Sequence, residues 1–289
     1  MVKTGTARPF GDGPIFDVHT HAFPDKLAAT AIAKLEAGGL WLAPRATYDG
    51  TVRGLVASMD RAGIRRAIVC SVATRPEQVM RITDWSASII SDRIVPLASL
   101  HPDFASPEAE IERAAAMGIK GLKFHAQYAG CAVDDPRVIR IARAAAKADL
   151  AMLFHAGYDL AYEKDDLASP ERLRRVHEAV PDLRMIAAHM GGWECWDEAA
   201  RHLLGLPVYL ETSFTIGRCP ADLLARILDR HPHDRLLFGT DAPWTDQTEE
   251  VAKFLALPIP EDLKRRMLWD NALAYLGENP ARPPHIAPL

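Results

Sequence analysis

The sequence alternates eight times between short apolar runs of strand length and longer segments with helical spacing. Apolar runs of about four to eight residues that are rich in branched side chains predict buried strands, and apolar residues three and four apart predict helices. Strands that alternate with helices form parallel sheets. The predicted strands are Ile15–Ala22, Ala67–Val72, Ile94–Leu100, Gly118–His125, Leu150–His155, Arg184–His189, Val208–Phe214 and Arg235–Asp241.

The number of these units selects one architecture. Eight strand–helix units over about 260 residues fit a closed (β/α)8 TIM barrel better than an open doubly wound sheet. No Gly-x-Gly-x-x-Gly follows the first strand, which argues against a dinucleotide-binding fold. We expect a single (β/α)8 catalytic domain over residues 15–277. An N-terminal arm would precede it at residues 1–14, and a Pro-rich tail would follow at residues 278–289.

Composition and charge exclude several classes of partner. The net charge is −4 and no block of Lys and Arg occurs, so we expect no nucleic-acid partner. No apolar run approaches the roughly 20 residues of a membrane span, and the first residues lack the apolar core of a signal peptide. The four Cys are scattered, as is typical of free thiols in a reducing compartment. We therefore expect a cytoplasmic protein without a membrane partner.

Polar residues gather where the predicted strands end. In a TIM barrel the chemistry lies at the C-terminal ends of the strands. The first strand carries Asp17, His19 and His21 at a spacing of two, so these side chains share one face. Two neighbouring imidazoles make half of a tetrahedral metal site. Later strands end at or near further polar residues, which are Lys123, His125, His155, His189, Glu211 and Asp241. Ligands that converge from several strands would explain this concentration.

Two of these residues have alternative interpretations. His125 is either a catalytic residue or a histidine whose hydrogen bonds are satisfied inside the barrel. Lys123 lies two residues before His125, so both side chains point the same way. An inward Lys is rare unless it is paired or modified. Lys123 would be carboxylated and bridge two ions, be neutral, or pair with a substrate carboxylate or an acid such as Glu211. We favour an unmodified Lys123.

The motifs taken in order resemble the amidohydrolase superfamily. The likeness is to the amidohydrolase-related group of TIM-barrel metal enzymes, which holds predicted metal-dependent hydrolases and decarboxylases similar to aminocarboxymuconate semialdehyde decarboxylase and γ-resorcylate decarboxylase. It runs from Ile15 to Gly277. The matching motifs are Asp17-Val18-His19-Thr20-His21, Gly121-Leu122-Lys123-Phe124-His125, Leu153-Phe154-His155-Ala156-Gly157, Ala188-His189-Met190-Gly191-Gly192, Phe238-Gly239-Thr240-Asp241 and Trp269-Asp270-Asn271-Ala272.

The resemblance implies a metal site. His19, His21 and Asp241 would bind one ion, and His155 would join them in a one-metal enzyme. In two-metal relatives, a carboxylated Lys on strand four bridges the ions, and the histidines of strands five and six hold the second. We favour one metal, with His189 as an acid or base. Asp17 would support the ligands without binding the ion.

The ligand set predicts the metal and two functions. Three imidazoles and a carboxylate suit Zn²⁺, with Mn²⁺ or Fe²⁺ as alternatives. The primary prediction is a hydrolase that uses metal-activated water on a small amide, ester or lactone. The alternative is a non-oxidative decarboxylase of an aromatic or unsaturated acid. The only partner expected is a small-molecule substrate, and a homo-oligomer is left open. The predicted catalytic residues are Asp241, His189, Lys123 and His125. The predicted pocket residues are Arg45, Tyr158 and Trp193, with Trp41 and Asp159 as further candidates.

Overall fold

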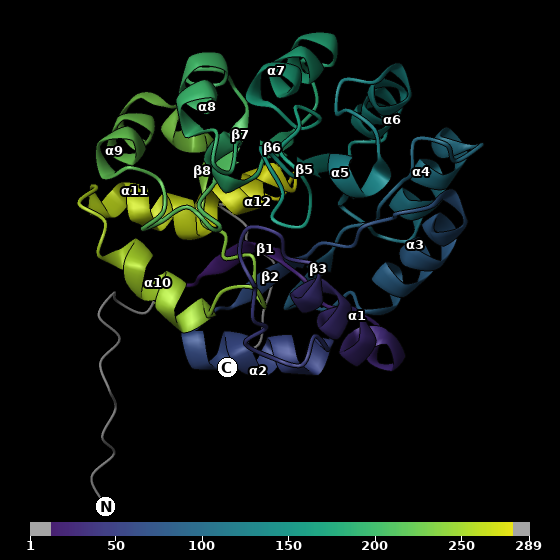
Figure 1. The fold of residues 1–289 in the computed structure, drawn as a ribbon, viewed down its shortest axis with the longest axis horizontal. Helices are drawn as coiled ribbons and strands as arrows, with labels where there is room; N and C mark the ends of the chain where they lie inside the picture. Colours follow the sequence, from purple (N-terminus) through teal and green to yellow (C-terminus); the bar gives the residue numbers. More distant parts are fainter. Residues whose placement is uncertain (1–12, 280–289) are drawn as a thin grey trace, which may run out of the picture.

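In the part of the chain that the structure describes, eight parallel strands form a barrel that is surrounded by helices (Figure 1). The computed structural model describes residues 13–279, so nearly all of the predicted arm and tail lie outside the described residues. Each strand of the described chain corresponds to one predicted run. The strands are β1 Phe16–Thr20, β2 Arg66–Val69, β3 Ile94–Pro96, β4 Gly121–Phe124, β5 Ala151–Phe154, β6 Met185–Ala187, β7 Tyr209–Glu211 and β8 Leu236–Leu237.

Two sheets join to close the barrel. Strands β1 to β3 pair in sequence order, as do β4 to β8, and every pairing is parallel. The bridge from Ala98 to Leu122 connects β3 to β4, and the bridge from Thr20 to Ala242 connects β1 to the chain after β8. The Val18 amide also donates to the Phe238 carbonyl at 3.0 Å. The predicted (β/α)8 TIM barrel is confirmed.

Helices cover the outside of the barrel, and several begin as their sequences predict. Pro occupies the first turn of α4, α6 and α7, where its missing N–H costs no hydrogen bond. The helices are α1 Asp25–Ala37, α2 Val52–Ala62, α3 Val79–Ser88, α4 Pro107–Ala116, α5 Ala126–Ala129, α6 Pro136–Lys147, α7 Pro170–Ala179, α8 Trp196–His202, α9 Ala221–Arg230, α10 Gln247–Leu255, α11 Glu261–Arg265 and α12 Asn271–Tyr275. Short 3-10 turns lie at Pro76–Gln78, His189–Gly191 and His233–Arg235, and a π-helical segment, Arg266–Asp270, joins α11 to α12. None of the described helices is long and apolar enough to cross a membrane.

The strands are shorter than the apolar runs that predicted them. Most of the expected site residues lie just beyond the ladders, where the backbone turns. His189 and Asp241 have φ values of 57° and 66°, a left-handed conformation that costs a non-glycine residue about 1–3 kcal/mol. Such strain clusters at functional sites. Loop geometry, rather than strand alternation, therefore aims these two side chains.

The core has two layers. Inside the barrel, Phe16, Val18, Leu97 and Leu153 belong to one buried cluster that also includes Tyr275 of α12. A larger buried cluster fills the space between the barrel and its helices. Because side chains fill the interior, an active site in this fold lies at the mouth of the barrel.

A buried histidine remote from the predicted site gives a pH-dependent stability. The His231 Nε2–H donates to the Val208 carbonyl at 2.8 Å, and burial lowers the pKa of His231 from 6.5 to about 4. Below pH 6.5, His231 therefore binds a proton in the unfolded chain but not in the folded chain. The free energy of unfolding falls as the pH falls toward 4. Between pH 7 and pH 5, His231 should remove about 2 kcal/mol from the free energy of unfolding.

Urea unfolding at both pH values tests this contribution. His231→Gln should reduce the loss between pH 7 and pH 5 by that amount, and His233→Gln, at a partly exposed neighbour, should not. An equal loss in the His231 variant and the unchanged protein would contradict the prediction.

Candidate active site

Three side chains, from β1 and from the chain just after β1 and β8, form a candidate metal site. The Nε2 atoms of His19 and His21 lie 3.5 and 2.9 Å from Asp241 Oδ1. Ligands about 2.1 Å from an ion lie roughly 3 Å apart when they meet near right angles. His19 is almost fully buried, and His21 and Asp241 are 14% exposed, so the group opens to a cavity. The residues fit a divalent metal.

The opposite nitrogen of each histidine is held by the protein. The His21 Nδ1–H donates to the Cys70 carbonyl at 2.9 Å, and His19 Nδ1 contacts Glu211 Oε1 at 3.0 Å. A proton on Nδ1 leaves the Nε2 lone pair free to bind a cation. Burial, together with the nearby Lys123 charge, lowers the pKa of His19 well below 6.5. His19 is therefore neutral and ready to be a ligand.

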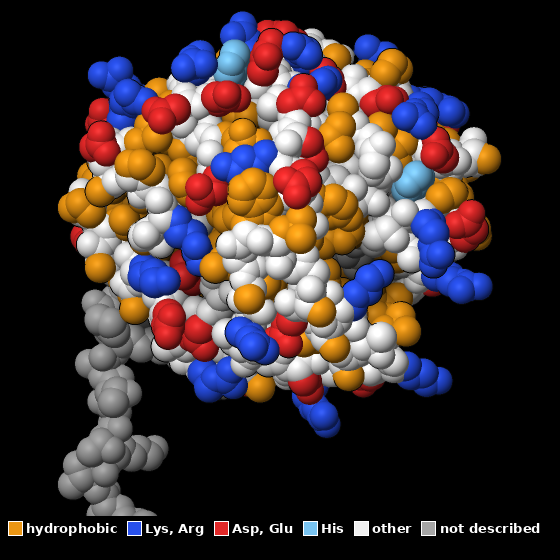
Figure 2. Space-filling model, in the orientation of Figure 1, with side chains coloured by type: hydrophobic (Ala, Val, Ile, Leu, Met, Phe, Trp, Pro, Cys, Tyr) orange, Lys and Arg blue, Asp and Glu red, His pale blue; other side chains and the backbone are white. Residues whose placement is uncertain are grey.

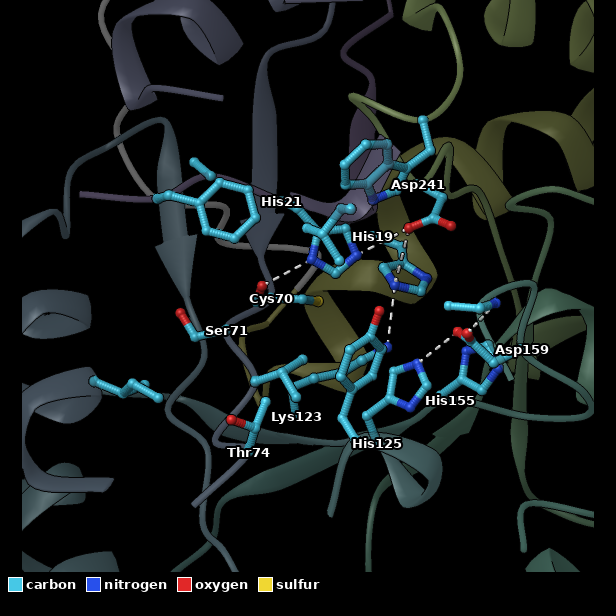
Figure 3. Close-up of a pocket in the computed structure, with 18 of the residues that line it drawn as sticks. His19, His21, Cys70, Ser71, Thr74, Lys123, His125, His155, Asp159 and Asp241 are labelled. Atoms are coloured by element: carbon cyan, nitrogen blue, oxygen red, sulfur yellow. Dashed lines mark hydrogen bonds and ion pairs between the residues drawn. The ribbon is translucent and has the colours of Figure 1, made fainter. Parts of the chain in front are cut away.

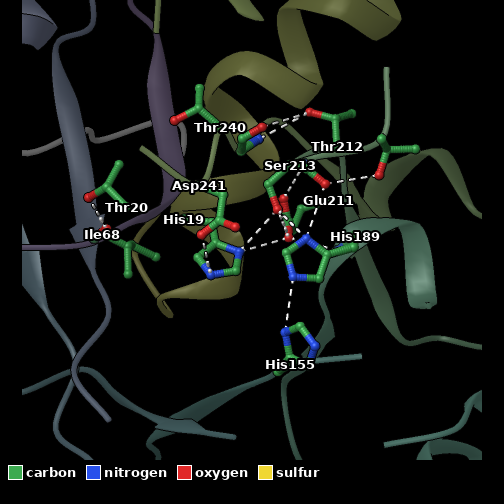
Figure 4. Close-up of polar contacts among 12 residues, drawn as sticks. His19, Thr20, Ile68, His155, His189, Glu211, Thr212, Ser213, Thr240 and Asp241 are labelled. Carbon is green, nitrogen blue, oxygen red and sulfur yellow. Dashed lines mark hydrogen bonds and ion pairs between the residues drawn. The ribbon is translucent and has the colours of Figure 1, made fainter. Parts of the chain in front are cut away.

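Glu211 is the centre of the hydrogen bonds behind the metal ligands (Figure 4). Its fully buried carboxylate accepts from the backbone N–H of His189 at 2.9 Å and from the Ser213 hydroxyl and N–H, each at 2.7 Å. A buried carboxylate is costly unless donors surround it, and this one is surrounded. The sequence offered a signal, an acid within an apolar strand, but Glu211 was considered only as a partner of Lys123.

Removing the charge of Glu211 should weaken metal binding. Glu211→Gln places an amide beside His19 Nδ1 and loses the charge-assisted contact, so affinity for Mn²⁺ or Zn²⁺ should fall about 10- to 100-fold. Competition with a chelator measures the affinity. Glu250→Gln is the control, because Glu250 is also buried but pairs with Lys253 on α10. Unchanged affinity in Glu211→Gln would show that Glu211 does not orient the ligand.

Lys123 lies beside the candidate metal site and is fully buried. Its Nζ is 3.1 Å from His19 Nε2, the nitrogen that faces the candidate site, and no carboxylate of the described residues forms an ion pair with it. Burial lowers the pKa of Lys123. Lys123 thus contacts a lone pair that a metal would otherwise bind, and the pairing with Glu211 considered from the sequence does not occur in this structure.

His155 and His189 face each other rather than the candidate ion. His155 Nδ1 and His189 Nε2 are 3.1 Å apart, while His155 Nε2 and His189 Nδ1 contact the carbonyls of Tyr158 and Ser213. A carbonyl only accepts, so each ring must carry a proton on the nitrogen that contacts a carbonyl. If both rings are neutral, the lone pairs of His155 Nδ1 and His189 Nε2 then face each other. Burial and then His125 lower the pKa of His155. A proton on His189 Nε2 resolves the conflict, as would a cation between the rings. The structure therefore does not place His155 with His19, His21 and Asp241, where the resemblance implied it.

His125 and Asp159 form a second group with His155. His125 Nε2 lies 3.2 Å from Asp159 Oδ2, and the His125 and His155 rings stack at 4.0 Å with 9° between their planes. Imidazole lone pairs lie in the ring planes, so two stacked rings cannot direct them to one ion. This group favours an imidazole–carboxylate pair over a metal site.

The Asp17 carboxylate supports the loop that carries Asp241. It accepts from the Thr240 hydroxyl at 2.6 Å and from Gln247 Nε2 at 2.8 Å. Burial raises the pKa of Asp17 to about 7, against the effect of these hydrogen bonds. For Asp241, burial is outweighed by the neighbouring histidines, His19 first, and its pKa is lowered to about 2. Asp241 is therefore the anion of the site.

A cavity of about 510 Å³ opens from the metal ligands (Figure 3). Tyr158, Trp193 and Asp159 line it, as the sequence analysis placed them. Arg45 and Trp41 do not. The Arg45 side chain is 85% exposed and lies 4.0 Å from Glu36, because the chain after α1 carries it outward. Trp41 instead stacks with the Lys164 ammonium and donates to the Tyr162 carbonyl. Two arginines that the sequence analysis did not single out, Arg75 and Arg81, line the cavity.

The family is decided by a match over nearly the whole described chain. The family described as amidohydrolase matches residues 16–277. The chain belongs to the amidohydrolase family. No protein of curated function matches it by sequence.

Three solved structures illustrate what this member of the amidohydrolase family is similar to. An uncharacterised TIM-barrel protein from Bordetella bronchiseptica is 21% identical with a TM-score of 0.74, and the match covers 92% of this chain and 100% of that one. The 5-carboxyvanillate decarboxylase from Sphingomonas paucimobilis is 17% identical, with a TM-score of 0.68 and coverage of 92% and 99%. A dihydroxybenzoic acid decarboxylase from Polaromonas sp., with bound manganese and the inhibitor 2-nitroresorcinol, is 16% identical, with a TM-score of 0.66 and coverage of 92% and 97%. At these identities the similarity establishes the fold.

These neighbours correct the functional preference. The hydrolase prediction placed decarboxylation second, yet the activities named among the similar structures are those of decarboxylases of aromatic acids. The order of the two alternatives was therefore wrong. The metal prediction holds at the level of a divalent ion, because three acidic and histidine side chains meet at ligand spacing and similar structures contain manganese.

Proposed function

We propose that this amidohydrolase-family protein is a metal-dependent, non-oxidative decarboxylase of an aromatic or unsaturated carboxylic acid. The observation that carries the proposal is one cavity in which His19, His21 and Asp241 meet walls that include Phe23, Trp85, Phe214 and other apolar side chains. Such a cavity suits a flat apolar acid whose carboxylate reaches the ion. The named activities of similar structures support the same choice.

The bound ion would supply positive charge that holds the oxygens of the substrate. In the reaction the bond between the carboxyl carbon and the neighbouring substrate carbon breaks, and carbon dioxide leaves. The electron pair of that bond stays on the substrate carbon, which takes up a proton. His189 is the proton donor in this proposal, because Ser213 holds its Nδ1–H and a proton on Nε2 would lie between the two rings, 3.1 Å from His155 Nδ1. Lys123 and His125 lie in the same cavity and would orient the leaving carboxylate.

The identity of the ion is part of the proposal. The histidine-rich ligand set suits Zn²⁺, whereas manganese is bound in two similar decarboxylases. We propose one ion per chain and expect Mn²⁺ to support at least as much turnover as Zn²⁺. Metal-free protein reconstituted separately with each ion, followed by metal analysis, measures both the count and the preference.

A substrate panel tests the reaction class. Metal-loaded protein is incubated with 2,6-dihydroxybenzoate, 5-carboxyvanillate, a phenyl lactone and an acetanilide, and both carbon dioxide release and hydrolysis are followed. We expect carbon dioxide from at least one aromatic acid and none from metal-free protein. Hydrolysis of the lactone or anilide with no carbon dioxide from any acid would refute the proposal.

A further inference from the structure

One face of α3 lines the cavity. Gln78, Arg81, Ile82 and Trp85 all contribute to its wall, and their spacing of three and four places them on one side of a helix. Gln78 caps α3 and Arg81 lies in its first turn, and both are polar, whereas Ile82 and Trp85 are apolar. A helix face that carries polar and apolar side chains next to one another can contact a ligand with both characters.

Helix α1 supplies an apolar wall of the same cavity. Leu27 and Leu35 line it together with Phe23 and Pro24, which precede the helix. Only Ala28 of α1 is buried, and Leu27 is 58% exposed. An apolar face that packs so little against the protein is an unusual use of a helix that covers a barrel. A ligand in the cavity would bury more of this wall.

Arg75 and Arg81 bring positive charge to this apolar region. Both are exposed, both line the cavity, and neither guanidinium forms an ion pair with a carboxylate of the described residues. Arg75 lies in the chain after β2, and Arg81 lies on α3. The two arginines therefore come from a different part of the cavity wall than His155 and His189, which follow β5 and β6. Guanidinium groups match the two oxygens of a carboxylate, so an anion is the group they fit.

The cavity is larger than a single-ring acid requires. Its volume of about 510 Å³ lies within the roughly 300–1,000 Å³ of pockets that bury drug-sized ligands. Figure 2 shows one face of the molecule, where hydrophobic side chains near the centre lie among charged ones. A ring bound at the metal ligands would leave the apolar walls of α1 and α3 uncovered.

We propose that the substrate is an elongated aromatic dianion. Its reacting carboxylate lies at His19, His21 and Asp241, its apolar body lies between α1 and α3, and a second, remote carboxylate pairs with Arg75 and Arg81. This inference rests on the proposed function for the reacting end only. It assigns Arg75 and Arg81 as the residues that select the acid by its length and its second charge.

A series of three probes tests the inference by binding rather than turnover. Benzoate, biphenyl-4-carboxylate and biphenyl-4,4′-dicarboxylate are titrated into Mn²⁺-loaded protein by calorimetry. The second ring should tighten binding about tenfold because it covers the apolar walls. The second carboxylate should tighten it about tenfold again through the arginines.

Variants separate the two contributions. Arg75→Gln combined with Arg81→Gln should remove the preference for the dicarboxylate over the monocarboxylate and leave the gain from benzoate to biphenyl-4-carboxylate. Trp85→Ala should do the reverse. Arg143→Gln is the control, since Arg143 is an exposed arginine of α6 that does not line the cavity. Circular dichroism confirms that each variant is folded.

The outcomes decide both proposals separately. Equal binding of the two biphenyl acids by the unchanged protein, or a dicarboxylate preference that survives the double arginine variant, overturns the inference. The predicted binding order without carbon dioxide release from any aromatic acid would leave the dianion site in place and count against decarboxylation. Carbon dioxide release from single-ring acids with no gain from the second ring would do the opposite.

Discussion

Asp241→Asn is expected to lower the rate of carbon dioxide release by at least about 10³-fold, within the range for loss of a metal-binding or acid–base group. Among the described residues, Asp241 is the one carboxylate that contacts both His19 and His21, and the histidines lower its pKa to about 2. Its negative charge would therefore offset that of the ion near neutral pH. An amide keeps the shape and removes the charge, so the bound ion should be lost as well.

Metal content and turnover must fall together for this interpretation to hold. Metal analysis after dialysis gives the first, and carbon dioxide release with excess Mn²⁺ gives the second. Asp222→Asn, at an exposed position in the first turn of α9, controls for the loss of one negative charge. If Asp241→Asn keeps a full equivalent of ion and normal turnover, the candidate metal site has been placed wrongly.

The barrel can be predicted from the sequence because its signal is repeated. Each strand is a short apolar run, and each is followed by a segment with helical spacing, so an error at one boundary does not change the count. Strand alternation, however, wrongly placed Asp17, His19 and His21 on one face. The register of β1 shifts between Asp17 and Thr20, so Asp17 contacts Thr240 and Gln247 while His19 faces the candidate metal site. What the pattern could not give is the direction of His189 and Asp241, because their left-handed backbone turns the side chains independently of strand alternation.

The residues around the ligands were less accessible to prediction. Arg45 was expected near substrate because it lies in the long chain segment after α1, but the path of that segment depends on contacts with Leu160 far along the sequence. Arg81 was overlooked because an arginine on an amphipathic helix looks like part of a solvent-facing surface. The structure shows that Arg81 also lines the cavity, because α3 lies against it.

The role of Glu211 could not be predicted from the sequence for a different reason. A buried carboxylate in β7 was visible in the sequence, yet two of its partners, His19 and His189, come from other segments, and only Ser213 lies beside it in the chain. Spacing within one strand cannot reveal such a meeting point. The hydrogen-bond network that orients the ligands is therefore a property of the closed barrel.

Lys123→Met should retain one tightly bound ion and lose turnover by about 10²–10³-fold. Lys123 Nζ lies 3.1 Å from the His19 nitrogen that an ion would bind. When the ion takes this lone pair, the Lys123 amine loses its partner and becomes a donor for the substrate carboxylate. Methionine has a similar length and no donor, so it should leave the metal ligands in place and remove this contact.

The metal-free protein gives a second readout that separates the alternatives for Lys123. Replacing a buried amine with an apolar side chain of similar size should raise the melting temperature of metal-free protein, because the cost of burying a charge-bearing group is removed. Lys120→Met, at an exposed position before β4, should leave it unchanged. A carboxylated Lys123 would behave differently: the unchanged protein would hold two ions about 3.5–4 Å apart, and Lys123→Met would lose at least one. A single ion in both proteins, with turnover lost only in the variant, would identify Lys123 as an unmodified residue that acts on the substrate.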